Sequence, residues 1–390
     1  MAQNSIIIFH RISYSKVLYN ELINHEEYDV HYLILNSDDI PDNVRCKKIY
    51  LEHHKIIVDT VHLVYSQKIN IYQIVALSEY DLLEASILRN IFNINMAHSV
   101  VDTIAHRDKL VMKNMIVNNS IRTAEYVSLS KLEKGFSNEW KKIILKPTNG
   151  AASNNIKLFN SESNFKYNHI KNPYSYMVEE YISGDILHFD GLVHNGNVLF
   201  SIASTYINNC LEFATKSTPL ASYQQENNNN IGWVIQCINA LNILNGPFHI
   251  EAILNKNGLY FLEAANRAGG ANVVKCTEYT TGVNLMQEQV KMQLYWDDYK
   301  HPDVLISDKV YGWFVIPHNS FNYNSDINNV KAITGNLLDL HKISINETEL
   351  NSGISYDEKH NPCTGIIFAD SEQEFKNIIN ILFKEIVTKY

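Results

Sequence analysis

The sequence lacks the cysteine patterns that hold a zinc ion or build a disulfide framework. Its five cysteines are scattered over 390 residues, are odd in number and never form a C-x-x-C pair. Near the start, the apolar run Ile6–Phe9 is too short for a signal peptide or a membrane span. We therefore expect a protein of the cytoplasm whose first strand is buried.

Positive charge is also scarce. The formal net charge is −9, and no block of five or more Lys and Arg residues occurs. A nucleic-acid partner is not expected, because phosphate neutralisation needs a basic surface. Hydrophobic residues make up 45% and charged residues 19%, which is the balance of a globular protein. A chain of 390 residues is longer than one that folds around a single hydrophobic core, so we expect two or three domains.

Several catalytic and nucleotide-binding motifs are absent too. No G-x-G-x-x-G follows the first expected strand, which argues against dinucleotide binding there, and no G-x-x-x-x-G-K-[ST] supports a P-loop NTPase. The sequence also has no G-x-S-x-G and no H-E-x-x-H, so hydrolase and metalloprotease chemistry have no support.

The order of expected strands and helices changes along the chain. The first hundred residues alternate the two, with strands at Ile6–Phe9 and Val30–Leu35 and helices at Ser15–Asn24 and Glu79–Phe92. This alternation predicts a small parallel α/β unit. From about residue 140 the pattern changes to longer strands and hairpins. We predict three domains, at residues 1–103, 104–182 and 183–390.

The expected hairpin at residues 248–264 carries the sharpest local pattern. A three-residue loop at Lys256–Gly258 would place Glu251 opposite Glu263, on one face with Phe261. Facing carboxylates destabilise a strand pair by up to about 1 kcal/mol, and a cation between them removes that cost. Mg²⁺ favours one or two carboxylates together with phosphate oxygens. A two-residue turn is the alternative, and it would put the two glutamates on opposite faces.

Two other segments could bind a phosphate group. Arg267 follows the second glutamate and could neutralise a transferring phosphoryl group, and Gly269 and Gly270 would let backbone approach a ligand. Lys146 ends an apolar strand, and the small residues 150–154 after it could fold their N–H groups over phosphates. Each segment also has an ordinary interpretation. The segment with Arg267 could be a plain strand-to-helix connection, and Lys146 could be a lysine at a strand edge.

Two further segments are ambiguous when taken alone. Arg107-Asp108-Lys109 begins an expected helix that runs to Asn118, and such a tripeptide is usually a solvated charge cluster. The expected strand Val178–Ile182 could present a backbone edge to adenine, or it could simply carry an exposed acidic face.

The order of these segments resembles the ATP-grasp family. The matching elements are Arg-Asp-Lys, a strand ending in Lys-Pro with a small-residue loop, Val-Glu-Glu-Tyr-Ile-x-Gly, and two glutamates twelve residues apart followed by an arginine. They extend from about Asp81 to Gly270. Glu-x-Ala followed by Arg-x-Gly-Gly is most similar to bacterial L-amino-acid ligases of the bacilysin-synthetase type. The resemblance implies a combined α/β and α+β fold, with an N-terminal Rossmann-like domain and ATP held between two α+β subdomains, a small lid with its linker helix and a large C-terminal part.

The resemblance also implies roles for individual residues. Lys109 and Lys146 would contact ATP phosphates, Arg267 would act with Lys146 in catalysis, and Glu251 and Glu263 would bind the metal. The remaining implied positions are the phosphate-covering loop (Gly150, Ala151, Ala152, Ser153), the adenine hinge (Glu179, Glu180, Tyr181, Ile182), a ribose-proximal histidine (His188) and substrate contacts (Asn266, Gly269, Gly270). Two features depart from the family pattern. The loop lacks a run of glycines, and Ala265 stands where the family has a metal-binding Asn, with Asn266 displaced by one.

The implied function is an ATP-dependent carboxylate–amine ligase. It would form an amide or peptide bond between small molecules such as amino acids through an acyl phosphate, and would release ADP and phosphate. The implied cofactors are ATP and Mg²⁺, which Mn²⁺ could replace. The expected partners are a small carboxylate and an amine, without nucleic acid or membrane, and a homodimer is left open. Two other interpretations remain: a biotin-carboxylase-like enzyme, which would need bicarbonate and a carrier, and a non-catalytic ATP-binding protein.

Overall fold

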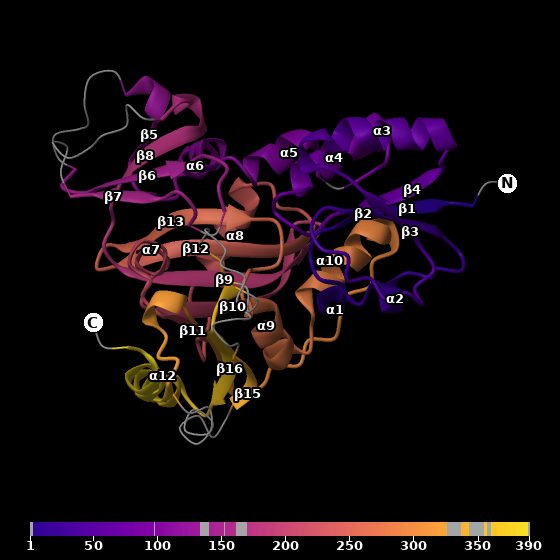
Figure 1. The fold of residues 1–390 in the computed structure, drawn as a ribbon. Helices are drawn as coiled ribbons and strands as arrows, with labels where there is room; N and C mark the ends of the chain where they lie inside the picture. Colours follow the sequence, from indigo (N-terminus) through magenta and orange to yellow (C-terminus); the bar gives the residue numbers. More distant parts are fainter. Residues whose placement is uncertain are drawn as a thin grey trace.

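The structure is a computed structural model. It describes residues 3–96, 98–132, 140–151, 153–160, 170–325, 337–342, 355–356 and 360–388. These residues form three β-sheets, and the sheets follow one another along the chain (Figure 1).

The N-terminal domain is built on a four-stranded parallel sheet in the order β3-β2-β1-β4. Helices cover both faces of the sheet, which explains why every residue of β1 is buried. The strands are β1 (Ser5–His10), β2 (Asp29–Ile34), β3 (Lys47–Tyr50) and β4 (Ile71–Val75). The helices are α1 (Tyr14–Val17), α2 (Tyr19–Leu22), α3 (Ile56–Gln67), α4 (Leu82–Ile91) and α5 (Val100–Ala105). The single helix expected over Ser15–Asn24 was wrong, because Leu18 adopts a left-handed conformation (φ 57°) and divides it into α1 and α2.

A helix from far along the chain completes this domain. Helix α10 (Leu285–Leu294) places Val290 and Leu294 in the same apolar cluster as α1, α2 and one face of the sheet. Gln293 of α10 donates to the Ala76 carbonyl (2.8 Å) and accepts from the Ala76 N–H (2.9 Å). The N-terminal core is therefore closed by residues that lie more than two hundred positions away in the sequence.

The small subdomain has a four-stranded antiparallel sheet in the order β5-β8-β6-β7. Its strands are β5 (Tyr126–Ser128), β6 (Ile143–Pro147), β7 (Lys157–Phe159) and β8 (Tyr176–Glu180). Helix α6 (Lys109–Asn118) leads into it and starts where the Asp108 carboxylate accepts the N–H groups of Leu110 and Val111.

The large subdomain has an eight-stranded antiparallel sheet in the order β13-β12-β9-β10-β11-β14-β16-β15. Its strands are β9 (Asp185–His194), β10 (Asn197–Ile207), β11 (Leu220–Gln224), β12 (Gly246–Asn255), β13 (Gly258–Ala265), β14 (Val310–Ile316), β15 (Leu337–Lys342) and β16 (Cys363–Ala369). Its helices are α7 (Cys210–Lys216), α8 (Ile231–Ala240), α9 (Val273–Thr281) and α12 (Glu372–Ile386). Helix α8 packs against β9 and β12, and α12 packs against β14 and β16.

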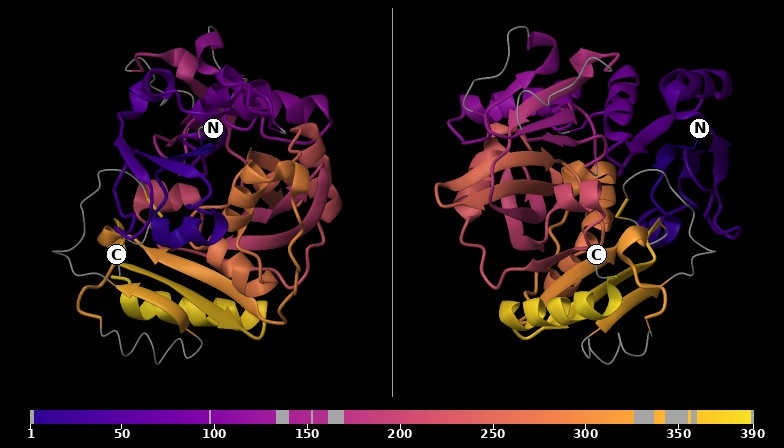
Figure 2. Two further views of the ribbon diagram at one scale, coloured as in Figure 1. Left: turned by 90° about the vertical axis from the view of Figure 1, so that its right-hand side faces the viewer. Right: turned by 60° about the vertical axis from the view of Figure 1, so that its left-hand side comes forward.

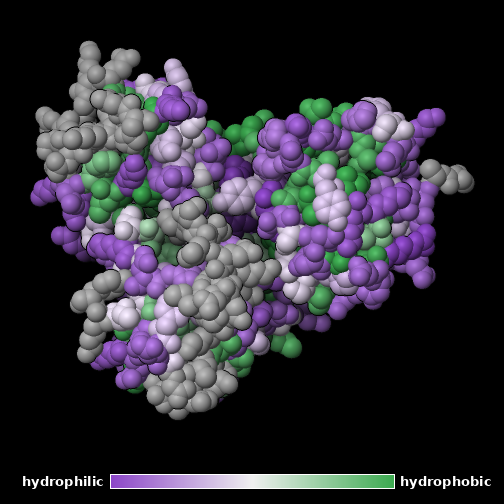
Figure 3. Space-filling view, viewed as in Figure 1, coloured by the Kyte–Doolittle hydropathy of each residue, from purple (hydrophilic) through white to green (hydrophobic). Residues whose placement is uncertain are grey.

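The three parts surround a central hollow. The small sheet lies over β12 and β13 of the large sheet, and the N-terminal domain lies beside both (Figures 1 and 2). In the space-filling view the surface is hollowed between the N-terminal domain and the other two parts, and hydrophilic side chains lie in the hollow (Figure 3). Across the described ranges, no helix is long and apolar enough to cross a membrane.

Candidate active site

The hairpin of β12 and β13 brings the two predicted metal ligands together by an unexpected route. Asn255 pairs with Gly258, so the turn contains two residues, which is the alternative expected to put the two glutamates on opposite faces. Glu251 nevertheless pairs directly with Glu263, because the register shifts between the Ala252–Phe261 and Glu251–Glu263 pairs. The extra residue is Leu262, which forms a β-bulge.

The bulge also decides which side chains face the cleft. Leu262 and Glu263 are consecutive and both line it. Phe261 is 1% exposed in the core beneath α8, so its expected place beside the glutamates was wrong. A neighbouring segment fixes Phe261 in that position. Its N–H donates to the Arg122 carbonyl (2.7 Å), and the Thr123 hydroxyl donates to its carbonyl (2.8 Å).

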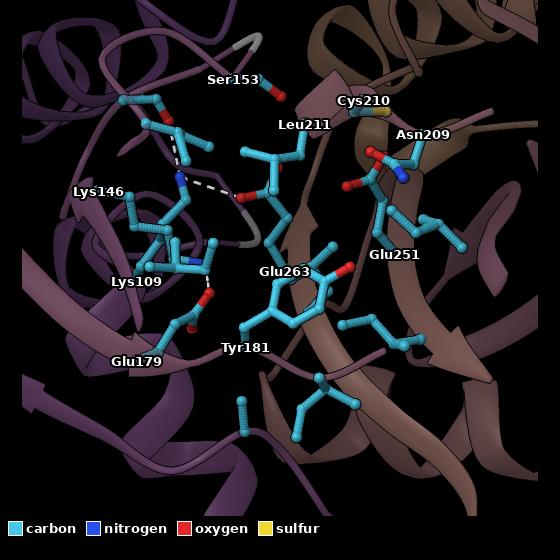
Figure 4. A pocket seen from close by; sticks show the side chains of 18 of the residues that line it. Lys109, Lys146, Ser153, Glu179, Tyr181, Asn209, Cys210, Leu211, Glu251 and Glu263 are labelled. Carbon is cyan, nitrogen blue, oxygen red and sulfur yellow. Dashed lines mark hydrogen bonds and ion pairs between the residues drawn. The ribbon is translucent and has the colours of Figure 1, made fainter. Parts of the chain in front are cut away.

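A cleft lies between the small and large sheets, and we call it the first cavity (Figure 4). It encloses about 940 Å³ including its open mouth, a size that suits a nucleotide. The predicted residues that line it are Lys109, Lys146, Gly150, Ala151, Ser153, Glu179, Glu180, Tyr181, Ile182, Glu251 and Glu263. The structure therefore brings most of the predicted nucleotide and metal residues into one space. Ala152 lies outside the described residues.

Both predicted phosphate lysines are paired with glutamates. Lys146 at the end of β6 is 3% exposed, and its Nζ lies 2.6 Å from Glu179 Oε1. Lys109 Nζ lies 3.1 Å from Glu263 Oε2 and donates to the Gly150 carbonyl at 2.7 Å. Figure 4 shows both ion pairs at this cleft. Lysine ammonium groups at this place can act as point charges on phosphates.

A third lysine, which the sequence patterns did not single out, completes the pairing. Lys113 of α6 is fully buried, and its Nζ lies 3.1 Å from Glu179 Oε2. Burial raises the pKa of Glu179, but the charges of Lys113 and Lys146 outweigh it and lower the pKa to about 2. Burial also lowers the pKa of Lys113 to about 8. The Glu179 carboxylate thus holds Lys146 in place.

Glu251 is more enclosed than Glu263. Its residue is 8% exposed, and the Tyr206 hydroxyl donates to its Oε1 at 3.0 Å. Burial raises the pKa of Glu251, yet the neighbouring His249 outweighs this and keeps the pKa below its usual value. The carboxylates of Glu251 and Glu263 on adjacent strands form an all-oxygen donor set that suits Mg²⁺.

His188 does not take the place predicted for it. It is 2% exposed and is absent from the residues that line the first cavity. Its Nδ1 lies 2.5 Å from Asp190 Oδ2, and its Nε2 lies 2.6 Å from Ser222 Oγ. Because both ring nitrogens are occupied by the protein, the prediction of a ribose contact was wrong.

A second cavity meets the first at the two glutamates. It encloses about 1060 Å³ including its open mouth and shares Glu251, Glu263, Ala151, Ser153 and Cys210 with the first cavity. All three parts of the chain contribute to its walls. The remaining residues that line it are Ile12, Leu77, Ser78, Glu79, Tyr80, Tyr206, His249, Arg267, Ala268, Gly269, Gly270, Ala271, Val273, Met286, Gln289, Trp313 and Tyr356.

Arg267 lies in this second cavity and is held by an acid from the N-terminal domain. Its Nε donates to Glu79 Oε2 at 2.8 Å, and Arg107 pairs with the same carboxylate. Burial raises the pKa of Glu79, but the two arginines outweigh it and lower the pKa to about 2. No sequence pattern pointed to Glu79, which follows β4 in the loop at the edge of the first sheet.

The three residues predicted to contact substrate lie in different surroundings. Gly270 lines the second cavity and has open space where a Cβ would stand. Gly269 lines it too, but a Cβ there would lie 2.6 Å from Asp190 Oδ1, so the glycine accommodates the protein's own side chain. Asn266 lines neither cavity, since its amide donates to the carbonyls of Asn245 (3.1 Å) and Pro247 (3.0 Å). The predicted substrate role of Asn266 was therefore wrong.

Comparisons with known proteins agree with this architecture. Residues 106–271 match the family model described as the ATP-grasp domain. No curated protein matches the chain by sequence. The chain therefore carries an ATP-grasp domain and has the ATP-grasp fold, which confirms the fold predicted from the order of the motifs.

Solved structures resemble the chain over its whole length. One is an L-amino acid ligase from Bacillus licheniformis, with a TM-score of 0.74 and 16% identity over 100% of this chain and 99% of that one. Another is an N5-carboxyaminoimidazole synthetase from Staphylococcus aureus complexed with ADP (TM-score 0.68, 12% identity, 98% of each chain). A third is a biotin carboxylase from Campylobacter jejuni in a β,γ-ATP complex (TM-score 0.63, 10% identity, 98% and 92%).

Proposed function

We propose that the protein is an ATP-dependent carboxylate–amine ligase. It joins small molecules, with amino acids as the favoured class, by an amide bond through an acyl phosphate, and it releases ADP and phosphate. The observation that carries this proposal is the position of Glu251 and Glu263. They stand where a cavity that contains Lys109 and Lys146 meets a second cavity that contains the partly buried Arg267.

The first cavity suits ATP. Residues 180–182 line it and would offer backbone groups to adenine, while Lys109 and Lys146 would contact the phosphates. Glu251 and Glu263 would hold Mg²⁺, which neutralises charge on the phosphate oxygens when it is bound. Solved structures of similar fold, an N5-carboxyaminoimidazole synthetase and a biotin carboxylase, hold ADP or an ATP analogue, which supports this use of the cavity.

The second cavity suits the acid and the amine. Hydroxide is a poor leaving group, so a free carboxylate must be activated before an amine can displace it. A carboxylate oxygen placed near the two glutamates would attack the terminal phosphorus and displace ADP, and Arg267 would neutralise charge on the transferred phosphoryl group. The amine would then attack the acyl carbon from the side of Gly270 and displace phosphate.

The test is a screen of the purified protein with ATP, Mg²⁺ and all pairwise mixtures of amino acids. We expect one ADP and one phosphate for each amide bond formed, without AMP. A phosphinate mimic of the product dipeptide should be phosphorylated in place and bind tightly. Stoichiometric AMP and pyrophosphate would refute the mechanism, and ADP release that depends on bicarbonate would favour a carboxylase. No stimulation by any small molecule would favour a non-catalytic ATP-binding protein.

A further inference from the structure

Two similar tripeptides lie side by side in the large sheet. His188-Phe189-Asp190 belongs to β9, and His249-Ile250-Glu251 belongs to the neighbouring antiparallel strand β12. In the register of these strands Glu251 pairs with His188, and His249 pairs with Asp190. Because side chains alternate along a strand, the two histidines and the two acids share one face of the sheet.

The four side chains form a continuous series of contacts. The Nδ1 atoms of both histidines donate to Asp190, from His188 to Oδ2 at 2.5 Å and from His249 to Oδ1 at 2.8 Å. The series continues from His249 Nε2 to Glu251 Oε1 at 3.6 Å. At its other end Ser222 Oγ lies 2.6 Å from His188 Nε2. It therefore runs from the interior of the sheet to the glutamate at the junction of the two cavities.

This series is buried and tightly enclosed. His188 and Asp190 are each 2% exposed. A Cβ on Gly269 would approach Asp190 Oδ1 to 2.6 Å and His249 Nδ1 to 3.0 Å, so the loop after β13 packs directly on the Asp190–His249 pair. Buried polar side chains that are fully paired in this way hold a single geometry.

The contacts on Glu251 all fall on one of its oxygens. Tyr206 donates to Oε1 at 3.0 Å, and His249 approaches the same atom. Within the described ranges no hydrogen bond is made to Oε2. Glu263 is held differently, because its side chain is 35% exposed and pairs with Lys109.

We propose that His188, Asp190 and His249 are positioning residues for Glu251, which fix its Oε1 so that Oε2 is presented to a divalent cation. This inference rests on the metal role that the proposed function gives to Glu251. Groups that orient a metal ligand typically change metal affinity by roughly ten- to a hundredfold when they are removed. His188 and Asp190 line neither cavity, and all three side chains act through Glu251.

The same atoms suggest a competing role. The ligand atoms of His188, Asp190 and His249 lie within 4.8 Å of one another, a spacing that a metal ion could bridge. Both Nδ1 atoms, however, stand at hydrogen-bond distance from the Asp190 carboxylate, which already satisfies them. The experiment must therefore separate orientation of Glu251 from direct metal binding.

The test measures Mn²⁺ binding by electron paramagnetic resonance with ADP present, together with adenosine affinity and thermal unfolding. We expect His249→Gln, Asp190→Asn and Gly269→Ala to weaken Mn²⁺ about ten- to a hundredfold and to leave adenosine affinity unchanged. Asp185→Asn is the matched control for Asp190, since Asp185 is exposed on the same strand. Gly232→Ala is the matched control for Gly269, since a Cβ there meets nothing within 4 Å.

Each outcome decides the question. Wild-type Mn²⁺ affinity in folded His249→Gln and Asp190→Asn overturns the inference. If Asp190→Asn does not fold, His249→Gln and Tyr206→Phe, which each remove one contact on Oε1, carry the test. Zinc retained by the wild type without nucleotide and lost in Asp190→Asn overturns positioning in favour of direct ligation. If the wild type itself binds no Mn²⁺ with ADP, the proposed metal role of Glu251 fails. If the wild type binds Mn²⁺ and the variants bind it equally well, only the positioning role fails.

Discussion

The two cavities on either side of Glu251 and Glu263 differ in the origin of their walls and in how their charges are held. The first lies between two subdomains, and its lysines are each paired with a glutamate of the same ATP-grasp domain. The second also needs the N-terminal domain, because Arg267 shares Glu79 with Arg107. The first cavity can therefore form within one domain, whereas the second depends on how the N-terminal domain docks.

Because of this difference, substitutions in different places should have separable effects. Changes at the shared glutamates should affect both cavities, and changes at the lysines should affect only the nucleotide. Changes at the N-terminal interface should affect the acid and amine while ATP binding without them stays normal. The following predictions use this separation.

The largest effect is expected at the shared glutamates. Replacing Glu251 or Glu263 by Gln should reduce ADP release by roughly a thousandfold, because a bound cation supplies several kcal/mol of charge stabilisation and each 1.4 kcal/mol is tenfold in rate. Thermal unfolding should show an intact fold, and Glu385→Gln on the exposed face of α12 should match the wild type. Wild-type turnover in Glu263→Gln, or turnover retained in EDTA, would contradict the metal site.

The next effect concerns the N-terminal interface. Glu79→Gln leaves Arg267 and Arg107 without their shared counter-charge, and breaking a partly buried pair of this kind should cost up to about 3 kcal/mol in unfolding free energy. The folded pKa of Glu79 is about 2, below its unfolded value of about 4.3. The stability that Glu79 contributes is thus present above about pH 4.3 and is lost as the pH falls towards 2.

Denaturant unfolding of wild type and Glu79→Gln at several pH values checks this. The gap in unfolding free energy should be constant near neutrality and should close between about pH 4.3 and pH 2. ATP affinity measured without acid or amine should be unchanged. A gap that is the same at pH 2 and pH 7 would show that the Glu79 charge does not stabilise the interface.

A smaller effect is expected for a lysine of the first cavity. Lys146→Ala should weaken ATP by roughly tenfold to over a hundredfold, since a hydrogen bond to a charged group contributes about 1.5–3 kcal/mol. Adenosine, which lacks phosphates, should bind normally. Calorimetric titration of both ligands checks the difference, and the exposed Lys141→Ala is the control. Equal losses for both ligands would mean that Lys146 has a structural role only.

The same contrast explains what the sequence could predict. The first cavity comes from segments whose order along the chain is distinctive, so Lys109, Lys146, Glu251 and Glu263 were placed correctly in one space. The second cavity combines side chains from Ile12 to Tyr356, and no local pattern links them. Glu79 was missed for that reason.

Two errors have a common physical cause, which is contact with other groups of the protein itself. The turn of the β12–β13 hairpin was predicted from its own residues, but the pairing of the glutamates depends on a bulge at Leu262 beside the contacts of Arg122 and Thr123. His188 was placed beside a ribose from its motif alone, whereas Asp190 and Ser222 occupy its ring. The repeated His-x-acid pattern on β9 and β12 was visible in the sequence and could have indicated this network.

The smallest effect is expected where α10 joins the first sheet. The Gln293 amide satisfies both the N–H and the carbonyl of Ala76, and these backbone groups are buried. Gln293→Ala leaves them unpaired, which should cost about 1–3 kcal/mol in unfolding free energy. Since Gln289 and Met286 of the same helix line the second cavity, the KM for the acid should rise a few-fold while ATP affinity stays normal. Gln287→Ala is the matched control, because its amide reaches the Val17 carbonyl only at 3.4 Å and its loss should matter less. A loss of ATP affinity equal to the change in KM would mean that both cavities depend on how the N-terminal domain docks. It would contradict the inference that only the second cavity does.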